Sequence, residues 1–347
     1  MKRINLALQG GGAHGAFTWG VLDRLLDQED VEIAAITGTS AGALNGAALK
    51  AGLLADGSGY DRASAKAALD DLWHNVAGVQ DLRMTNWMAS FAASNDVIAR
   101  TLELSPVNMM ADMATRFVSP YHLGPFYANP LQQVVDKFAF DQVCADTGPK
   151  LFISATNVRS GKIRVFQGDE ISTDVILASA CLPSVFQAVE IDDPKTGQRE
   201  AFWDGGYTGN PALFPLFHKD LPDDIMVVNI NPLWRDDIPR EPMDIQNRIN
   251  EISFNSSLLR ELRAISFVKR LIKDGQMSSD QMSDVLVHMI SDDDLMRDLS
   301  VATKLSPSPV VLSRLKTAGQ DAADRFLSNH INDLGQRATV DLEQMFG

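Results

Sequence analysis

Short apolar runs and amphipathic stretches alternate through the first fifty residues of the chain. Residues 4–8 form an apolar run that predicts a buried strand, and glycines interrupt it directly afterwards. Residues 15–27 carry apolar side chains at helical spacing, which predicts a helix. A second apolar run covers 33–37, and a sharp turn over 38–42 leads into another predicted helix. Strands and helices in this order predict parallel strands covered by helices.

The pattern changes over residues 57–140. These residues are mostly helical in pattern, rich in methionine and aromatic side chains, and broken by prolines, which predicts an insertion in the α/β frame. Strand-like runs return at 151–155, 163–166 and 226–230. The Gly-Lys pair at 161–162 favours a hairpin between the first two of these strands.

Helical patterns dominate the last third of the chain, over 244–273, 277–300 and 312–345. The expected fold is therefore α/β with three layers, a mainly parallel central sheet flanked by helices, a helical insertion and a helical C-terminal region. We expect an α/β domain over 4–231, with the insertion at about 57–140, and a C-terminal helical region over 232–347 packed on it.

The charge balance narrows the choice of partners. With 45 acidic and 31 basic residues the formal net charge is −14, which argues against nucleic acid as a partner. The same charge gives no general attraction to an anionic membrane, so peripheral membrane contact has to be local and apolar. Two cysteines form neither a disulfide framework nor a metal motif. Residues 4–8 are too short for a signal peptide, so we expect a cytoplasmic protein. No pattern indicates an oligomeric state.

The first glycine cluster follows the first predicted strand. Gly10, Gly11, Gly12 and Gly15 stand where a helix begins, and unpaired N–H groups at such a place attract an anion or a developing oxyanion. The cluster also satisfies the G-x-G-x-x-G dinucleotide pattern. That pattern expects an acidic residue at the end of the second strand, whereas Glu32 lies at its start. A nucleotide-binding oxidoreductase and a plain tight turn remain as alternatives.

The second cluster, GTSAG at 38–42, has the G-x-S-x-G form between a predicted strand and a predicted helix. Gly38 and Gly42 relieve crowding around a strained turn that lifts the Ser40 hydroxyl above the sheet. Since loops after neighbouring parallel strands meet at one edge of the sheet, we expect Ser40 to face the first glycine cluster. Fixed N–H donors beside a nucleophile are what an oxyanion hole requires.

A serine nucleophile needs a base, and Asp204 is the better candidate. It is followed by Gly205 and Gly206, so backbone can approach it closely, and the apolar pair at 202–203 can desolvate it and raise its basicity. An ordinary Asp-Gly turn is the alternative for this motif alone. None of the six histidines has a convincing loop context; they are His14, His74, His122, His218, His288 and His330.

Together these clusters resemble the patatin-like phospholipase family. The matching pieces are GGGAHG at 10–15, GTSAG at 38–42 and DGG at 204–206. ASACLP at 178–183 resembles the family's A-S-x-x-x-P block, and NP at 210–211 is also similar to family members. The order and spacing of the motifs match the family. The resemblance covers residues 4–231 apart from much of the insertion.

The resemblance implies a lipid acyl hydrolase that cleaves carboxylic esters of phospholipids or lysophospholipids through an acyl-enzyme. It implies Ser40 and Asp204 as a catalytic dyad, an oxyanion hole from Gly10, Gly11 and Gly12, and neither catalytic metal nor cofactor. The expected partner is a lipid or fatty-acyl ester substrate. His14 stands where many members carry Arg or Lys. A carboxylesterase acting on small soluble esters and a catalytically silent regulatory protein are the alternatives.

Two amphipathic segments have a function that the sequence leaves open. In the insertion, methionine and aromatic stripes are typical either of core or of an acyl-chain site. They comprise Met84, Trp87, Met88 and Phe91, then Met109, Met110, Met113 and Phe117. Residues 245–273 mix isoleucines and leucines with arginines and lysines. This pattern predicts either a helix packed on the body with solvated basic side chains or one lying on a membrane.

Overall fold

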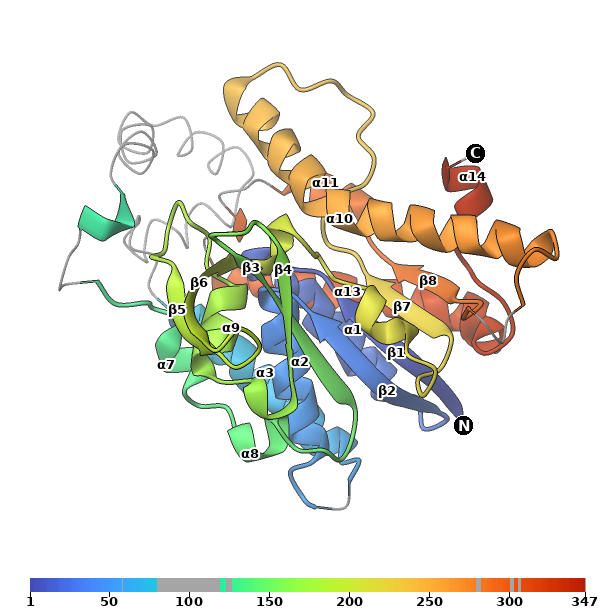
Figure 1. Cartoon of the computed structure of the whole chain (residues 1–347), viewed down its shortest axis with the longest axis horizontal. Helices are drawn as coiled ribbons and strands as arrows, with labels where there is room; N and C mark the ends of the chain where they lie inside the picture. Colours follow the sequence, from blue (N-terminus) through green and yellow to red (C-terminus); the bar gives the residue numbers. More distant parts are fainter. Residues whose placement is uncertain are drawn as a thin grey trace.

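The computed structural model describes residues 1–57, 59–79, 119–122, 127–278, 282–299, 303–304 and 307–346. Across these residues the chain forms one eight-stranded sheet in the order β5-β6-β3-β2-β1-β7-β8, with β4 paired to β3 (Figure 1). The strands are β1 (Lys2–Leu8), β2 (Val31–Gly38), β3 (Lys150–Asn157), β4 (Ile163–Gln167), β5 (Val189–Asp193), β6 (Gln198–Asp204), β7 (Asp224–Val228) and β8 (Leu286–Ile290).

The sheet is mixed but mostly parallel, as predicted. β3, β2, β1, β7 and β8 run parallel to one another. β4 and β6 are antiparallel to β3, and β5 is antiparallel to β6. The predicted hairpin at 161–162 is confirmed by the β3–β4 pairing, with Gly161 in the left-handed region at its tip.

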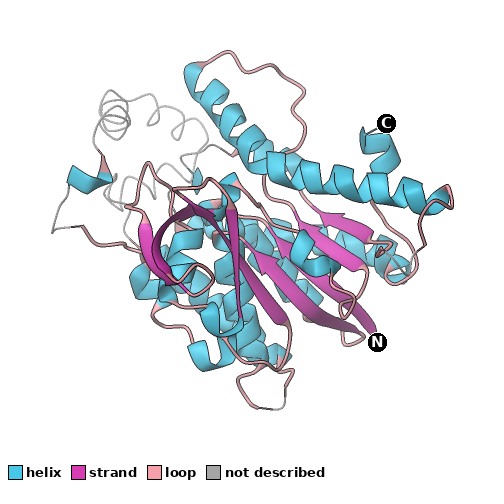
Figure 2. Cartoon of the chain, viewed as in Figure 1, coloured by secondary structure: helices cyan, strands magenta, loops and turns pink. Residues whose placement is uncertain are grey.

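Helices cover both faces of the sheet (Figure 2). The larger helices are α1 (Gly15–Leu25), α2 (Ala41–Leu53), α3 (Arg62–Ala77), α9 (Thr173–Ser179), α10 (Pro242–Lys273), α11 (Asp293–Asp298) and α13 (Pro309–His330). Shorter ones are α7 (Gln132–Val135), α8 (Phe140–Val143) and α14 (Leu342–Phe346). Single 3-10 turns are η1 (Gly12–His14), η3 (Gly168–Glu170), η4 (Gly205–Tyr207), η5 (Phe214–Phe217) and η6 (Ile331–Asp333).

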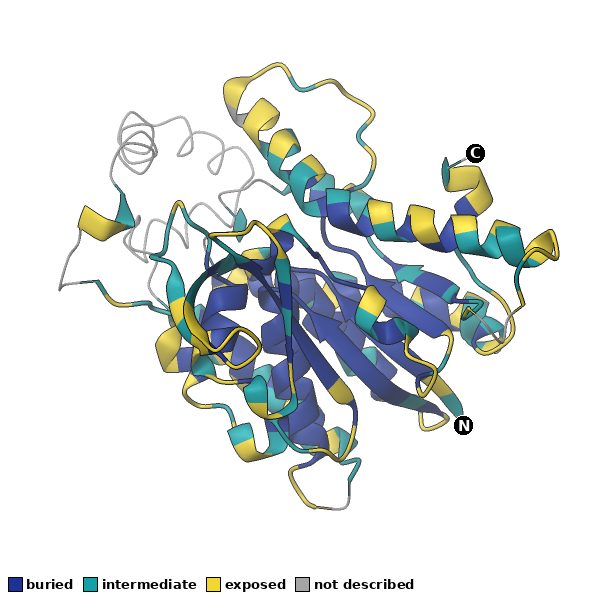
Figure 3. Ribbon diagram, in the orientation of Figure 1, coloured by how far each residue is buried: buried dark blue, intermediate teal, exposed yellow. Residues whose placement is uncertain are grey.

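The alternation of side chains along the strands divides the core into two halves. In β1, Leu6 and Leu8 belong to the core half that includes α1, α2, α3, α9 and α13. Ala7, between them, belongs to the half that includes α10 and α14. The central strands are therefore buried on both sides (Figure 3), which explains their nearly continuous apolar sequences.

Helices α1 and α13 pack with their backbones in contact. A Cβ atom on Gly20 of α1 would overlap the carbonyl oxygen of Lys316 in α13. In the reverse direction, a Cβ atom on Gly319 of α13 would overlap the carbonyl oxygen of Phe17. The two glycines allow the end of the chain to lie directly on its first helix.

Some sequence-based expectations differ from the structure. The segment 277–300 was expected to be helical, but it contains β8, which extends the sheet beside β7. β5 and β6 were not predicted because alternating acidic, basic and apolar residues hide their strand pattern. The ends of the predicted insertion hold α3, α7 and α8. Both methionine and aromatic stripes fall in 80–118, outside the described residues.

Candidate active site

Ser40 lies on a strained turn between β2 and α2. Its φ of 54° and ψ of −121° lie in a backbone region that residues other than glycine rarely adopt. The side chain is 8% exposed, at the N-terminus of α2. This strand, turn and helix arrangement is the context expected of a G-x-S-x-G nucleophile.

Close backbone contacts explain the glycines around Ser40. A Cβ atom on Gly42 would overlap the carbonyl oxygen of Leu8 at the end of β1, and one on Gly38 would lie 2.5 Å from the Gly42 carbonyl oxygen. A Cβ atom on Gly10 would lie 2.7 Å from the Cβ atom of Ser40. The glycine loop after β1 therefore touches the serine turn after β2, as expected for neighbouring parallel strands.

Asp204 ends β6, beside the carboxyl end of β3, and its side chain is 1% exposed. The carboxylate accepts a hydrogen bond from the Gly206 N–H at 2.7 Å, and the nearby Ser40 hydroxyl favours its ionised form. Burial raises the pKa of Asp204 from 3.8 to about 7, although the Gly206 N–H and the Ser40 hydroxyl act in the opposite direction. The structure thus places the turn that carries Ser40 against the turn that follows Asp204, since a Cβ atom on Gly205 would lie 3.0 Å from Thr39 Cγ2.

The side chain of Asn210 accepts the N–H of Gly10, one of the three amides predicted for the oxyanion hole. Its Oδ1 accepts the Gly10 N–H at 2.7 Å, and its Nδ2 donates to the Gly10 carbonyl oxygen at 3.3 Å. Asn210 is fully buried, so this N–H has no freedom to turn toward a substrate. Gly10 therefore differs from the prediction: it anchors the loop. No hydrogen bond between described residues takes the N–H of Gly11 or Gly12.

A buried polar network fixes the glycine loop from behind. Gln9 accepts hydrogen bonds from the backbone N–H groups of Ile230 and Asn231 and donates to the Asn255 side chain of α10. Asn231 donates to the Gly10 carbonyl oxygen and accepts from Lys304 Nζ, at 2.9 Å in both cases. Burial lowers the pKa of Lys304 to about 8. Residues far apart in the sequence thus hold one short loop in place.

A family model described as patatin-like phospholipase matches residues 6–217. This range covers more than half of the chain and includes the glycine loop, Ser40 and Asp204. The chain belongs to the patatin-like phospholipase family. The first of the two regions expected from the sequence, 4–231, contains the whole matched range.

No curated protein matches this patatin-like chain. Among solved structures, it is similar to VipD from Legionella pneumophila. The two share 15% sequence identity over 95% of this chain and 67% of that chain, with a TM-score of 0.42.

Ser179 contacts the candidate site of this patatin-like protein, and the sequence alone did not predict a function for it. It lies at the end of α9, inside the ASACLP block, and its side chain is fully buried. Its Oγ accepts the N–H of Ser40 at 2.9 Å. The block thus supplies an acceptor for a donor that the strained turn would otherwise leave buried and unpaired. The A-S-x-x-x-P motif was the available signal.

The two buried histidines of this patatin-like protein have partners other than Ser40 and Asp204. His14 is buried, its Nε2 lies 2.7 Å from Thr303 Oγ1, and burial together with Lys304 lowers its pKa well below the usual range. It therefore supplies no permanent positive charge near the loop. His288 Nε2 lies 2.9 Å from Asp224 Oδ1, at the N-terminal end of β7. Within the described ranges, no three His, Cys, Asp or Glu side chains gather as metal ligands.

Proposed function

We propose that this chain hydrolyses carboxylic ester bonds of phospholipids or lysophospholipids, with Ser40 as nucleophile and Asp204 as base. Family membership supports the class of reaction. The observation that carries the proposal is that the turn bearing Ser40 lies against the turn after Asp204. A Cβ atom on Gly205 would lie 3.0 Å from Thr39 Cγ2, and the Ser40 hydroxyl acts to lower the pKa of the buried Asp204 carboxylate. A base whose pKa is about 7 is half deprotonated near neutral pH, where it accepts a proton well and later returns it.

The proposed reaction has two stages. In the first, Ser40 Oγ attacks the ester carbonyl carbon while its proton passes to Asp204, and the leaving alcohol then takes that proton. In the second, Asp204 removes a proton from water, which attacks the acyl-enzyme. The fatty acid leaves and Ser40 regains its proton. Neither stage needs a histidine.

The proposed oxyanion hole consists of the amides of Gly11 and Gly12. Both groups adjoin Gly10, whose backbone is held against the serine turn by Asn210. Donors that are fixed before the reaction stabilise the oxyanion without rearranging, and removing one such donor typically lowers kcat by roughly 10²–10³-fold. The loop is rigid because its neighbours Gln9 and Gly10 are hydrogen-bonded on several sides.

Two measurements test this proposal. Purified wild type should hydrolyse a p-nitrophenyl acyl ester and react with a fluorophosphonate probe, and Ser40→Ala should lose both properties. Lipid profiling of the same pair, with phospholipids and lysophospholipids of varied head group, identifies the substrate. Unchanged turnover in Ser40→Ala would remove Ser40 as the nucleophile. Turnover of short esters without any lipid turnover would favour a carboxylesterase, and an unlabelled wild type would favour a silent regulatory protein.

A further inference from the structure

Helix α10 buries one side of its surface against the sheet. Leu258, Leu262 and Ile265 belong to the core half that includes Ala7 of β1 and Val287 of β8. Two of the three acidic side chains of α10 are also directed inward, whereas Asp244 is exposed in its first turn. Glu251 is buried and pairs with Arg235, and Glu261 accepts the N–H groups of residues 213 and 214. The inner side therefore takes up most of the negative charge of the helix.

The opposite side of α10 exposes large apolar side chains. Ile245, Ile249 and Ile252 are 42%, 53% and 55% exposed, and Phe267 is 53% exposed. Their spacing places all four on one side of an α-helix. Figure 3 shows exposed residues along the outer side of α10, with buried ones toward the sheet. Exposed large apolar side chains aligned in a stripe of this kind mark an interaction surface.

Arginines lie among these apolar residues. Arg260, Arg263 and Arg270 share the exposed side, and no acidic side chain in the described part of the chain pairs with any of them within 4.0 Å. The Arg270 guanidinium lies over the Phe267 ring at 5.8 Å. With six basic and three acidic residues, α10 has a net charge of +3, whereas the whole chain has −14.

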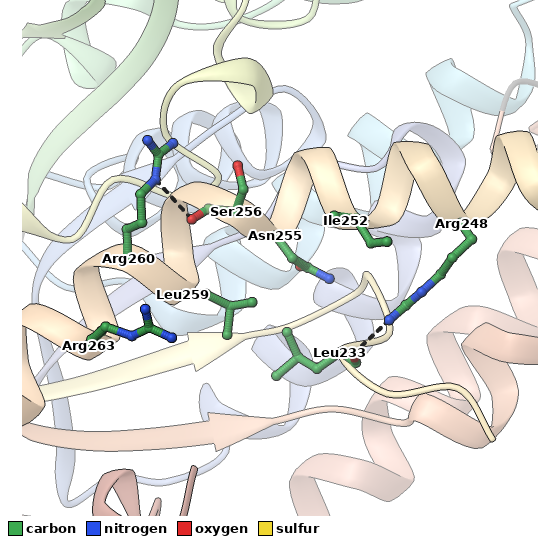
Figure 4. Close-up of a pocket in the computed structure, with 8 residues that line it drawn as sticks. All are labelled: Leu233, Arg248, Ile252, Asn255, Ser256, Leu259, Arg260 and Arg263. Atoms are coloured by element: carbon green, nitrogen blue, oxygen red, sulfur yellow. Dashed lines mark hydrogen bonds between the residues drawn. The ribbon is translucent and has the colours of Figure 1, made fainter. Parts of the chain in front are cut away.

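A pocket of about 210 Å³ interrupts this stripe (Figure 4). Leu233, Ile252 and Leu259 contribute apolar walls, and Arg248, Arg260 and Arg263 line it as well. Aliphatic walls beside guanidinium groups suit an amphiphilic anion, since the walls accept methylene groups and the arginines bind phosphate. The pocket and the stripe form one surface, which we call the outer face of α10.

We propose that the outer face of α10 docks on an anionic phospholipid bilayer. Its occupant follows from charge complementarity: three exposed arginines, none paired with an acidic side chain among the described residues, lie on one side of a helix in a protein that otherwise repels anionic surfaces, and Arg263 also contacts the Phe346 ring at 5.2 Å. An amphipathic helix with isoleucine, phenylalanine and arginine on one side matches the head-group region, where apolar side chains enter and basic ones contact phosphates. This property goes beyond the proposed hydrolysis and does not require it.

The other side of α10 links this surface to the candidate active site. Phe254 stacks near Tyr207, at 5.4 Å between ring centroids, and leaves no room for a Cβ atom on Gly206. Ser257 accepts the N–H of Asn210, which in turn holds Gly10. A bilayer bound to the outer face would therefore lie one helix diameter from the residues that hold the dyad and the glycine loop.

Vesicle co-sedimentation of the full chain tests the docking surface. Wild type should sediment with vesicles of phosphatidylcholine and phosphatidylglycerol, far less with phosphatidylcholine alone, and less again at high salt. Arg260→Gln, Arg263→Gln and Arg270→Gln together should lower the partition coefficient on the order of 100-fold, at about fivefold for each basic residue. Ile249→Gln with Ile252→Gln should lower it independently of salt.

A matched control changes three exposed basic residues elsewhere, through Lys162→Gln, Lys195→Gln and Arg314→Gln. It should bind nearly as wild type does, and equal loss in both triple variants would overturn the proposal. Wild type that stays in the supernatant, or that sediments without vesicles through self-association, would also overturn it. Ser40→Ala should bind vesicles normally, so failure of docking and failure of the proposed catalysis are separately visible.

Discussion

Replacing Asp204 by asparagine should abolish hydrolysis and, above neutral pH, stabilise the fold. The carboxylate is 1% exposed, and burial raises its pKa from 3.8 to about 7. Asparagine has nearly the same shape, retains an oxygen that can accept the Gly206 N–H, and cannot ionise. Removing a base of this kind should lower kcat by roughly 10²–10⁴-fold.

The stability effect follows from proton linkage. Between pH 3.8 and about 7 the folded state holds the Asp204 proton and the unfolded chain does not. The free energy of unfolding of wild type therefore falls as pH rises through this window, by about 1.4 kcal/mol per pH unit. Over the whole window the loss is on the order of 4 kcal/mol. Asp204→Asn has no such loss. Its stability should therefore equal that of wild type near pH 3.8, and its full gain in the free energy of unfolding should be present above about pH 7.

Urea unfolding followed by tryptophan fluorescence measures this difference, and the chain has five tryptophans. The free energies of unfolding of wild type and Asp204→Asn should be equal at about pH 4 and differ by several kcal/mol at about pH 8. Asp220→Asn, at a side chain 70% exposed, is the control and should show no such separation. A difference that does not change with pH would refute the burial explanation, and near-normal turnover would refute the assignment of Asp204 as base.

Three further predictions follow from the site and the fold. In wild type, kcat/KM for a short-chain ester should rise with pH and reach half of its plateau near pH 7, because Asp204 acts only when deprotonated; a profile flat from pH 5 to 8 would contradict this. Ser179→Ala should lower kcat about tenfold with little change in KM, since the buried Ser40 N–H loses its acceptor; wild-type kinetics would show that the contact is dispensable. Gly20→Ala should lower the free energy of unfolding by about 1–3 kcal/mol, because its methyl group overlaps the Lys316 carbonyl oxygen; an unchanged Tm would contradict the close contact of α1 and α13.

The sequence predicts the first half of the sheet well because local patterns determine it. β1 and β2 are short apolar runs, and the glycines after them stand where backbones touch. β8 was missed because five residues with His288 in their centre show no clear period. That histidine is tolerated in the core since Asp224 binds it, a contact between residues 64 positions apart.

The candidate site, like the sheet, could be predicted only where local patterns determine it. Ser40 and Asp204 stand out through glycines next to them in the sequence, so their motifs are local. The function of Asn210 is invisible in this way, because it holds Gly10 from 200 positions away. Lys304 is equally remote from Asn231, and no pattern around it distinguishes it from a surface lysine. Local signals identify the proposed reacting groups, whereas the groups that hold them depend on tertiary contacts.

The contact between the glycine loop and the far end of the chain has a consequence during protein synthesis. Gly12 lies against the carbonyl oxygen of Lys304, and α13 rests on α1 through Gly20 and Gly319. A ribosome completes Ser40 and Asp204 about a hundred residues before it adds Lys304. The nascent chain therefore carries both Ser40 and Asp204 while the glycine loop still lacks its contact with Lys304. Full order at the site should therefore come only after the segment that includes α13 has left the ribosome.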